Sequence, residues 1–257
     1  INLDECKEYI LKRLSYDEYS ASVIIPNNSI LIPNNSIFGT KHKKTYECTF
    51  CNKIYSTNYW FDNESRSGAG STLKSTENIR YHLPKILEKF NIKKLFDAPC
   101  GDFNWMSQVL KKVDIDYLGS DIVKDLIVSN KKYENDKIKF SKLDIIVDKL
   151  PASDLMICRD CLFHFSYEDI FLFLNNFISS DIKYILLTSN LNEEYKFENK
   201  DIVTGDYRKI DLFSKPFNFE KNYIYSFDDK NKLEIQHFRQ MYLFSKLQIK
   251  NNLIKKQ

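Results

Sequence analysis

The segment Lys94-Leu-Phe-Asp-Ala-Pro-Cys-Gly-Asp-Phe-Asn-Trp-Met106 decides the fold. A short apolar run ends on Asp97, a tight Pro-Cys-Gly loop follows, and a helix-like stretch comes next. This order predicts a strand, a loop and a helix. It is the first unit of an open α/β sheet, whose ligands bind beyond the carboxyl ends of the strands.

The loop of this segment discriminates between ligands. A dinucleotide pyrophosphate binds to a glycine-rich turn with free N–H groups and no acid nearby. Here Asp97 and Asp102 flank the loop, and Pro99 has no N–H group to donate. A dianion would be repelled, whereas a ligand with an ammonium and a sulfonium group would be attracted, and Gly101 lets the backbone approach it closely. The loop therefore favours S-adenosylmethionine (SAM) over NAD.

Two more short apolar runs lead to acids at the positions where the next strands of a βαβ unit would end. The run from Ile115 ends on Asp121, which is positioned to accept both ribose hydroxyls of a nucleoside. The run from Ile138 leads to Asp144, which is positioned to accept from the adenine amine. Each carboxylate could instead cap the helix that follows it. The predicted cofactor-binding residues are Asp97, Ala98, Pro99, Gly101, Phe103, Asp121, Ile122, Asp144, Ile145, Arg80 and Arg159.

The rest of the chain continues the alternation of helices and strands. Apolar spacing from Ser75 predicts a helix, which we expect Pro84 to kink or restart. The stretch from Asn190 to Phe219 is long and irregular, as functional loops often are. The other predicted elements are strands at Asp154–Cys158, Lys183–Ser189, Tyr223–Phe227 and Gln240–Leu247 and a helix at Tyr167–Ser179.

The sequence predicts three parts: an N-terminal extension at residues 1–64, a main domain at residues 65–250 and a frayed tail at residues 251–257. We expect a short amphipathic helix at Cys6–Leu14 and a possible hairpin at Thr45–Tyr59. Between them, the sequence Ile-Pro-Asn-Asn-Ser-Ile occurs twice, and its proline and asparagines are typical of turns. The extension either covers the active site as a lid or dimer arm, or simply packs on the edge of the main sheet.

The loop sequence Asp97-Ala-Pro-Cys-Gly-Asp-Phe103 resembles motif I of the class I SAM-dependent methyltransferases, whose usual form is Asp-x-Gly-Cys-Gly-x-Gly. Pro99 and Phe103 replace two of its three glycines. The segments Ser65–Thr72, Cys158–Ser166 and Gly205–Phe219 are similar to a bacterial subgroup associated with surface-glycan gene clusters. The resemblance covers Ser65 to Leu247 and implies an enzyme with a Rossmann-like, seven-stranded, mostly parallel sheet. Within the subgroup it points to a methyltransferase of the capsular O-methyl phosphoramidate pathway.

Methyl transfer from a sulfonium is an in-line displacement, so the protein must above all position the acceptor. A neutral hydroxyl acceptor also needs a base, and His164 is the candidate, although it could be a core residue between two phenylalanines. An anionic phosphoramidate needs a cationic grip instead. Arg208, next to Tyr207, is the candidate, because its planar guanidinium can donate paired hydrogen bonds to phosphate-type oxygens. It could instead be a surface arginine paired with a nearby aspartate.

Other polar residues complete the expected acceptor site. Arg66 is a second candidate grip, and Asp160 either steadies His164 or meets the methionine ammonium. Arg159 is expected to contact the cofactor. The predicted substrate-binding residues are Arg66, Ser71, Trp105 and Asp160.

Composition limits the other function classes. The net charge of +3, from 38 basic and 35 acidic residues without an arginine-rich run, argues against a nucleic-acid partner. No apolar stretch reaches the roughly 18 residues of a membrane span, so a cytoplasmic protein is expected. The resemblance implies a small-molecule or nucleotide-linked acceptor, and the protein could be a monomer or a dimer. The six cysteines fit buried free thiols better than a zinc site, for which only Cys48 and Cys51 are a plausible start.

Three alternatives remain open at this point. The first is a sugar-hydroxyl O-methyltransferase that uses His164 as its base. The second is an NAD-dependent oxidoreductase on the same sheet, which the acid and proline of the first loop disfavour. The third is a noncatalytic partner protein that retains the SAM-binding fold.

Overall fold

The computed structural model of the chain describes residues 55–59, 61–192, 196–229 and 239–254. The helix and the repeat expected near the N-terminus, and the Cys48–Cys51 pair, lie outside these residues. Part of the hairpin expected at Thr45–Tyr59 is described, and its residues 55–57 are helical instead.

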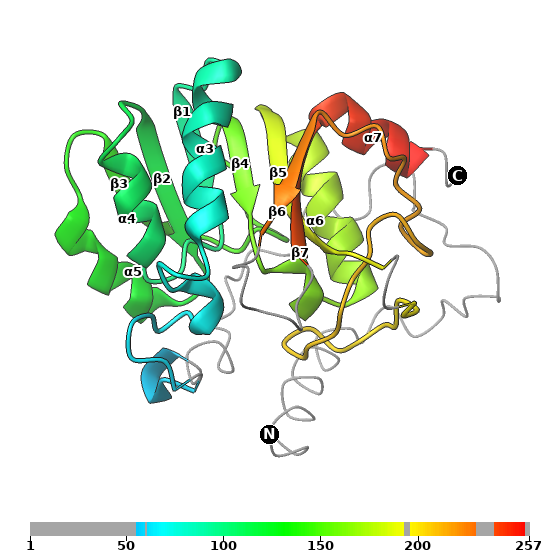
Figure 1. Cartoon of the computed structure of the whole chain (residues 1–257), viewed down its shortest axis with the longest axis horizontal. Helices are drawn as coiled ribbons and strands as arrows, with labels where there is room; N and C mark the ends of the chain where they lie inside the picture. Colours follow the sequence, from blue (N-terminus) through cyan, green and yellow to red (C-terminus); the bar gives the residue numbers. More distant parts are fainter. Residues whose placement is uncertain (1–54, 60, 193–195, 230–238, 255–257) are drawn as a thin grey trace. The chain divides into compact units, whose positions relative to one another are not determined.

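A seven-stranded sheet forms the centre of the described residues, in the order β3-β2-β1-β4-β5-β7-β6 (Figure 1). Neighbours from β3 to β5 pair in parallel, whereas β7 is antiparallel to both β5 and β6. The predicted Rossmann-like, mostly parallel sheet is therefore confirmed. The strands are β1 (Lys94–Asp97), β2 (Asp116–Asp121), β3 (Ile138–Lys142), β4 (Ser153–Cys158), β5 (Ile182–Asn190), β6 (Tyr225–Asp228) and β7 (Arg239–Ser245).

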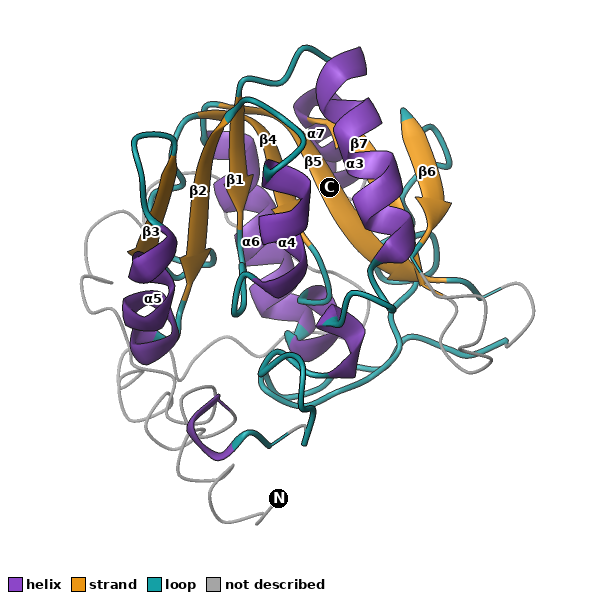
Figure 2. Ribbon diagram, turned by 60° about the vertical axis from the view of Figure 1, so that its left-hand side comes forward, coloured by secondary structure: helices purple, strands orange, loops and turns teal. Residues whose placement is uncertain are grey.

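Helices cover both faces of this sheet (Figure 2). On one face lie α3 (Glu77–Lys89), α4 (Asn104–Leu110) and α5 (Lys124–Asn130). On the other lie α6 (Tyr167–Ser179) and α7 (Lys246–Ile254). Because β5 is covered on both faces, Ile185–Asn190 are buried without interruption, and only the first half of this segment, Ile185–Leu187, is apolar. The short 3₁₀ helices are η1 (Ala69–Ser71), η2 (Lys131–Tyr133) and η3 (Leu162–His164).

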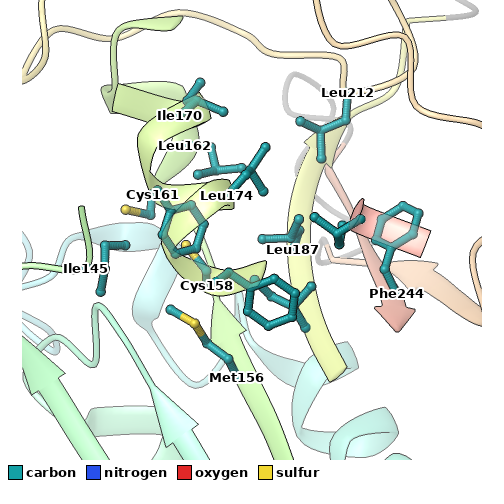
Figure 3. Close-up of a cluster of buried hydrophobic side chains, with 14 of the residues drawn as sticks. Ile145, Met156, Cys158, Cys161, Leu162, Ile170, Leu174, Leu187, Leu212 and Phe244 are labelled. Carbon is teal, nitrogen blue, oxygen red and sulfur yellow. The ribbon is translucent and has the colours of Figure 1, made fainter. Parts of the chain in front are cut away.

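The core beneath α6 joins side chains from distant parts of the chain (Figure 3). Met156 and Cys158 of β4 and Leu187 of β5 pack with Ile170 and Leu174 of α6. Cys158 and Cys161 are buried free thiols here, and Cys100 is a buried free thiol of the other core. The prediction of buried free thiols is thus confirmed for these three cysteines.

The structure corrects two helix predictions: the first helix does not restart at Pro84, and the C-terminal tail is helical up to Ile254. α3 runs as one helix from Glu77 to Lys89 with Pro84 inside it, and its buried apolar face continues on both sides of the proline. α7 extends to Ile254, so the tail expected to fray from residue 251 is helical up to that point. Burial of Ile249 and Leu253 against the core explains why the last helix does not fray.

The expected irregular stretch from Asn190 to Phe219 has no regular element beyond Asn190, the last residue of β5, among its described residues, yet it is anchored. The amide of Asn190 donates to the carbonyl of Ile210 at 2.7 Å, and the amide of Ile210 donates to Asn190 Oδ1 at 2.8 Å. Ile210 and Leu212 are fully buried in the core under α6. The loop is therefore fixed to the carboxyl end of β5, at the edge where ligands of such sheets bind.

None of the helices in the described ranges has the length and apolar character needed to cross a bilayer.

Candidate active site

The loop after β1 is shaped by two unusual backbone features. The Ala98–Pro99 peptide bond is cis, and Gly101 adopts a left-handed φ of 56°. A Cβ atom on Gly101 would lie 2.3 Å from Ser67 Oγ, so only glycine fits. Ala98 is fully buried, and its amide donates to the carbonyl of Ile157 in β4. The loop is therefore held tightly between the neighbouring strand and the segment that contains Ser67.

Asp97 is a buried carboxylate at the end of β1, with 2% of its surface exposed. The hydroxyl of Tyr117 donates to Asp97 Oδ2 at 2.9 Å. Burial raises the pKa of Asp97 to about 7, even though the Tyr117 hydrogen bond and the charge of Arg159 lower it. A cationic ligand at this carboxylate would favour its ionised form.

Asp121 ends β2 directly beside the first loop. Its Oδ2 accepts from the amide of Gly101 at 3.2 Å, and its Oδ1 accepts from the amide of Val123 at 3.0 Å. Burial raises the pKa of Asp121, against these backbone hydrogen bonds. Two accepted bonds leave lone pairs on the carboxylate, since it has about four acceptor sites. Ile122, next to it, packs against the apolar core on the α5 side.

Asp144 lies beyond the end of β3, because the strand stops at Lys142. Its Oδ1 accepts from the amide of Ile146 at 2.9 Å, and its amide donates to Asp148 Oδ2 at 2.8 Å. Ile145 turns its side chain into the core under α6 (Figure 3). Asp144 thus forms a local turn at the edge of the sheet.

Phe103, predicted to bind the cofactor, and Trp105, predicted to bind the substrate, are both buried. Phe103 has a left-handed φ of 62°, and its ring packs against Tyr117 and Phe140 with centroids 5.4 Å and 5.0 Å away. Trp105 of α4 is buried, and the guanidinium carbon of Arg159 lies 5.8 Å from its ring centroid. Their side chains therefore support the loop from its core side.

The segment Glu64–Ser71 is attached to the first loop by Asp102. Asp102 accepts from Ser65 Oγ at 3.0 Å and from the amide of Arg66 at 2.8 Å, and its own amide donates to Ser67 Oγ at 3.0 Å. Ser71 donates its amide to the carbonyl of Gly68 and accepts from Asn104 Nδ2. These hydrogen bonds fix the segment Glu64–Ser71, here called the strap, against the loop that follows β1, a contact that the sequence did not predict.

Arg66, predicted to bind the substrate, and Arg80, predicted to bind the cofactor, line two different pockets. The Arg66 guanidinium donates to the carbonyl of Tyr55, 5.5 Å from its ring centroid, and lines a pocket of about 220 Å³ with Asp102 and Lys132. Arg80 donates to Thr76 Oγ1 and to the carbonyl of Leu73. It lines a separate pocket of about 280 Å³ between α3 and the end of α4.

Four charged residues form a compact group, here called the charge cluster: Arg159, Asp160, Asp229 and Arg239. Arg159 Nε donates to Asp229 Oδ2 at 2.8 Å, and its Nη1 lies 3.2 Å from Asp160 Oδ2. Arg239 Nη1 lies 2.9 Å from the same oxygen of Asp160. The sequence analysis did not single out Asp229 and Arg239, because neither lies in a recognisable motif. Asp229 follows β6 and Arg239 begins β7, the two antiparallel strands at the edge of the sheet.

His164 and Tyr207 lie side by side near this cluster. Their ring centroids are 5.9 Å apart, and His164 Nδ1 lies 2.8 Å from the carbonyl oxygen of Asp206. Burial lowers the pKa of His164, while the Asp206 carbonyl and the charge of Asp160 act in the opposite direction. Tyr207 is half exposed, and burial raises its pKa, which Arg239 lowers and Asp160 raises.

Arg208 points away from this pair into the protein. Its Nη1 donates to the carbonyl of Leu162 at 2.9 Å, and its Nε donates to the carbonyl of Lys200 at 3.3 Å. The guanidinium is buried, and burial lowers its pKa. Within the described residues its buried Nη2 has no hydrogen-bond partner. The anion-gripping role stays a prediction.

The described residues contain no group of three or more His, Cys, Asp or Glu side chains arranged to hold a metal ion.

The chain is similar to known proteins in its fold. No protein-family model matches the chain, and no curated protein matches it. Among solved structures, a SAM-dependent methyltransferase from Leishmania major is similar with a TM-score of 0.55 and 13% identity, over 76% of this chain and 82% of that chain. The fold is that of the class I methyltransferases.

Two further structures are similar over most of their own length. Magnesium protoporphyrin IX methyltransferase from Synechocystis PCC 6803, solved with bound SAH, has a TM-score of 0.51 and 10% identity, over 77% of this chain and 94% of that chain. The methyltransferase domain of the bacterial protein CtHen1 has a TM-score of 0.50 and 15% identity, over 68% and 98%. At such identities the likeness establishes the fold, and activity has to be argued from the site.

Proposed function

We propose that this protein is a SAM-dependent methyltransferase. The observation that carries the proposal is a pair of buried carboxylates, Asp97 and Asp121, at the carboxyl ends of adjacent strands on either side of the first loop. Burial raises the pKa of both, so a cationic ligand would stabilise their ionised forms. A diphosphate at the same loop would meet two acids and a proline without an N–H group.

The residues fit an adenosyl donor as follows. Asp97 would meet the methionine ammonium, and the remaining acceptor positions of Asp121 would take the ribose hydroxyls. Asp144 would accept from the adenine amine. The bound cofactor supplies a methyl group on a sulfonium, and the protein holds the acceptor oxygen in line with it.

Calorimetric titration tests this assignment directly. We expect wild-type protein to bind SAM and its product S-adenosylhomocysteine (SAH), and not to bind NAD. Binding of NAD without binding of SAM would replace the proposal with the oxidoreductase alternative.

For the acceptor, we propose an anionic oxygen, such as that of a free or nucleotide-linked phosphoramidate used in bacterial surface-glycan synthesis in the cytoplasm. This rests on the resemblance of Ser65–Thr72, Cys158–Ser166 and Gly205–Phe219 to the surface-glycan subgroup. An oxyanion is already nucleophilic and needs no base. Turnover assays should therefore show methylation of phosphoramidates, and His164→Ala should retain kcat within about fivefold.

A second candidate, a sugar-hydroxyl O-methyltransferase, is favoured by one observation at His164. A carbonyl oxygen can only accept, so the contact with the Asp206 carbonyl assigns the proton of the neutral ring to Nδ1 and leaves Nε2 as the basic nitrogen. For a hydroxyl acceptor, His164→Ala should lower kcat by about 10² to 10⁴. SAM binding without turnover on either acceptor class would favour the noncatalytic alternative.

A further inference from the structure

Tyr117 connects β2 to the carboxylate at the end of β1. The register of the sheet places Asp97 of β1 and Phe140 of β3 on either side of Gly119 in β2. Because side chains alternate between the two faces of a strand, Tyr117 and Gly119 share one face. The Tyr117 side chain therefore extends along β2 to Gly119, and its hydroxyl donates to Asp97 Oδ2 at 2.9 Å.

Gly119 provides the space that the phenol occupies. A Cβ atom on Gly119 would lie 2.8 Å from the Tyr117 hydroxyl oxygen and 2.8 Å from Cδ1 and Cε1 of Phe140. These separations are too short for a real side chain, so any larger residue would displace the hydroxyl or the Phe140 ring. A glycine inside a strand often marks such a close approach. The contact between Tyr117 and Asp97 therefore explains the glycine in β2.

Aromatic neighbours hold the ring of Tyr117 in place. Its centroid lies 5.4 Å from that of Phe103 and 5.9 Å from that of Phe140. The rings of Phe103 and Phe140 in turn meet edge to face, with centroids 5.0 Å apart. Tyr117 is 2% exposed, so water has little access to its hydroxyl. Phe103, which belongs to the loop after β1, thereby supports the phenol that reaches Asp97.

The proton of this hydrogen bond stays on Tyr117. Burial and the charge of Asp97 raise the pKa of the Tyr117 phenol well above its usual range. The hydroxyl is therefore a donor throughout the neutral range of pH, and its hydrogen bond is stronger to an ionised carboxylate than to a neutral acid. The bond uses one of about four acceptor positions of the ionised carboxylate, so positions remain for a ligand.

Other ionisable groups also act on Asp97. Burial, which raises the pKa of the carboxyl, has the largest effect, and the Tyr117 hydrogen bond is the strongest influence that lowers this pKa. The charge of Arg159 also lowers it, and that of Asp121 raises it. The thiol of Cys100 is uncharged near neutral pH, because burial raises its pKa well above the usual range. Without the Tyr117 hydroxyl, the Asp97 carboxyl would therefore be largely protonated at neutral pH.

We propose that Tyr117 is a positioning residue for SAM: in the space left by Gly119, its hydroxyl holds the Asp97 carboxylate in the orientation and charge state that receive the methionine ammonium. This deepens the proposed function and rests on it for the identity of the ligand. Tyr117 acts through Asp97 and is not itself a catalytic residue. The role requires the phenol hydroxyl, because a phenylalanine ring would pack against Phe103 and Phe140 equally well.

The first experiment follows the Asp97 carboxyl in the ligand-free protein by NMR. Aspartate labelled isotopically at its side-chain carboxyl carbon gives a signal for each aspartate, and Asp97→Asn identifies the signal of Asp97 by its loss. In wild type this signal should titrate with a midpoint at about pH 7. Tyr117→Phe should move the midpoint upward by about one pH unit, the effect of one hydrogen bond to a charged group. An unchanged midpoint overturns the proposal.

The second experiment measures SAH affinity by calorimetric titration at pH 7 and pH 8.5. Tyr117→Phe should weaken binding about fivefold at pH 7 and less than about twofold at pH 8.5, because the Asp97 carboxyl ionises again at the higher pH. Damage to packing alone would weaken binding equally at both pH values, and that result also contradicts the proposed role. Tyr184→Phe, which removes a hydroxyl from β5, is the matched control and should leave the affinity unchanged at both pH values.

A double variant shows whether Tyr117 acts through Asp97. In Asp97→Asn the side chain no longer ionises, so adding Tyr117→Phe should cause no further loss of affinity that depends on pH. A further loss that recovers at pH 8.5 would mean that Tyr117 acts through another group. Circular dichroism confirms that each variant is folded. If Tyr117→Phe does not fold, Gly119→Ala, which displaces the hydroxyl, takes its place in both experiments.

The two experiments also distinguish this proposal from the proposed function. If wild type binds neither SAM nor SAH, the methyltransferase assignment fails, and the NMR titration by itself decides whether Tyr117 keeps Asp97 ionised. If wild type binds SAH and Tyr117→Phe binds it equally well at pH 7, the positioning role fails alone.

Discussion

The amide of Gly101 donates a hydrogen bond of 3.2 Å to Oδ2 of Asp121, and this bond joins the loop after β1 to the end of β2. Two residues that are twenty positions apart in the chain thereby define one side of the proposed cofactor site. The bond also lowers the pKa of Asp121, against the effect of burial, which raises it. It makes the carboxylate the first target for mutation.

Asp121→Ala is expected to weaken SAM binding by at least tenfold, because the ribose loses its acceptor and the loop loses its tie to β2. Calorimetric titration measures the change. Asp116→Ala is the matched control, since Asp116 is an exposed acid at the other end of the same strand. Equal SAM affinity in wild type and Asp121→Ala would count against the adenosyl site.

SAM affinity should depend on pH through Asp97. Its pKa of about 7 means that the carboxyl is largely protonated at pH 6 and largely ionised at pH 8. If only the ionised form attracts the methionine ammonium, affinity rises about tenfold between these pH values. Asp97→Asn should bind weakly, with little change over the same range. A flat wild-type profile from pH 6 to 8 would contradict this role.

The same carboxyl should affect stability. Its folded pKa of about 7 lies above the usual 3.8, so the folded state binds the proton more tightly. The contribution of Asp97 to stability therefore falls as pH rises from about 4 to 7, by up to about 4 kcal/mol. Urea unfolding at pH 8 should find Asp97→Asn more stable than wild type. At pH 4 the two proteins should differ little.

Asp102→Ala is expected to loosen the strap. The carboxylate accepts from Ser65 Oγ and from the amide of Arg66, and its loss leaves these donors without their partner. We expect a loss of about 1–3 kcal/mol in unfolding free energy. Hydrogen exchange at the Arg66 amide should become faster than in Asp125→Ala, which removes an exposed acid from α5. Unchanged exchange would mean that Asp102 does not hold the strap.

Arg208→Ala separates a structural role from an anion-binding role. Its buried guanidinium donates to the carbonyls of Leu162 and Lys200, so its removal should lower the unfolding free energy by about 2 kcal/mol. The sequence-based hypothesis instead expects loss of turnover with SAM affinity retained. A fully stable Arg208→Ala protein that binds SAM but does not turn over would support the hypothesis and contradict the structural expectation.

The sequence alone predicted the fold because its signals are local. Three apolar runs that lead to Asp97, Asp121 and Asp144, with a helix-like stretch after the first, specify a parallel sheet through alternation of short-range patterns. The helix at Tyr167–Ser179 was predicted to the residue, since its N-cap Ser166 and its apolar spacing lie within one stretch. Only the burial of Leu253 against distant residues revealed that α7 extends into the expected tail.

Contacts between distant residues were decided by the tertiary structure. Arg239 and Asp160 are 79 positions apart, and only the placement of β7 against β5 brings them within 2.9 Å. In the same way, Ser65 and Asp102 are 37 positions apart, so no local sequence motif could predict the hydrogen bond between them that holds the strap. The sequence by itself determined the acids at the strand ends and the sheet that carries them, because periodicity and loop chemistry are local properties. The tertiary structure decided which charged side chains pair, as with Arg239 and Asp160, because a side chain's partner depends on how separate strands pair.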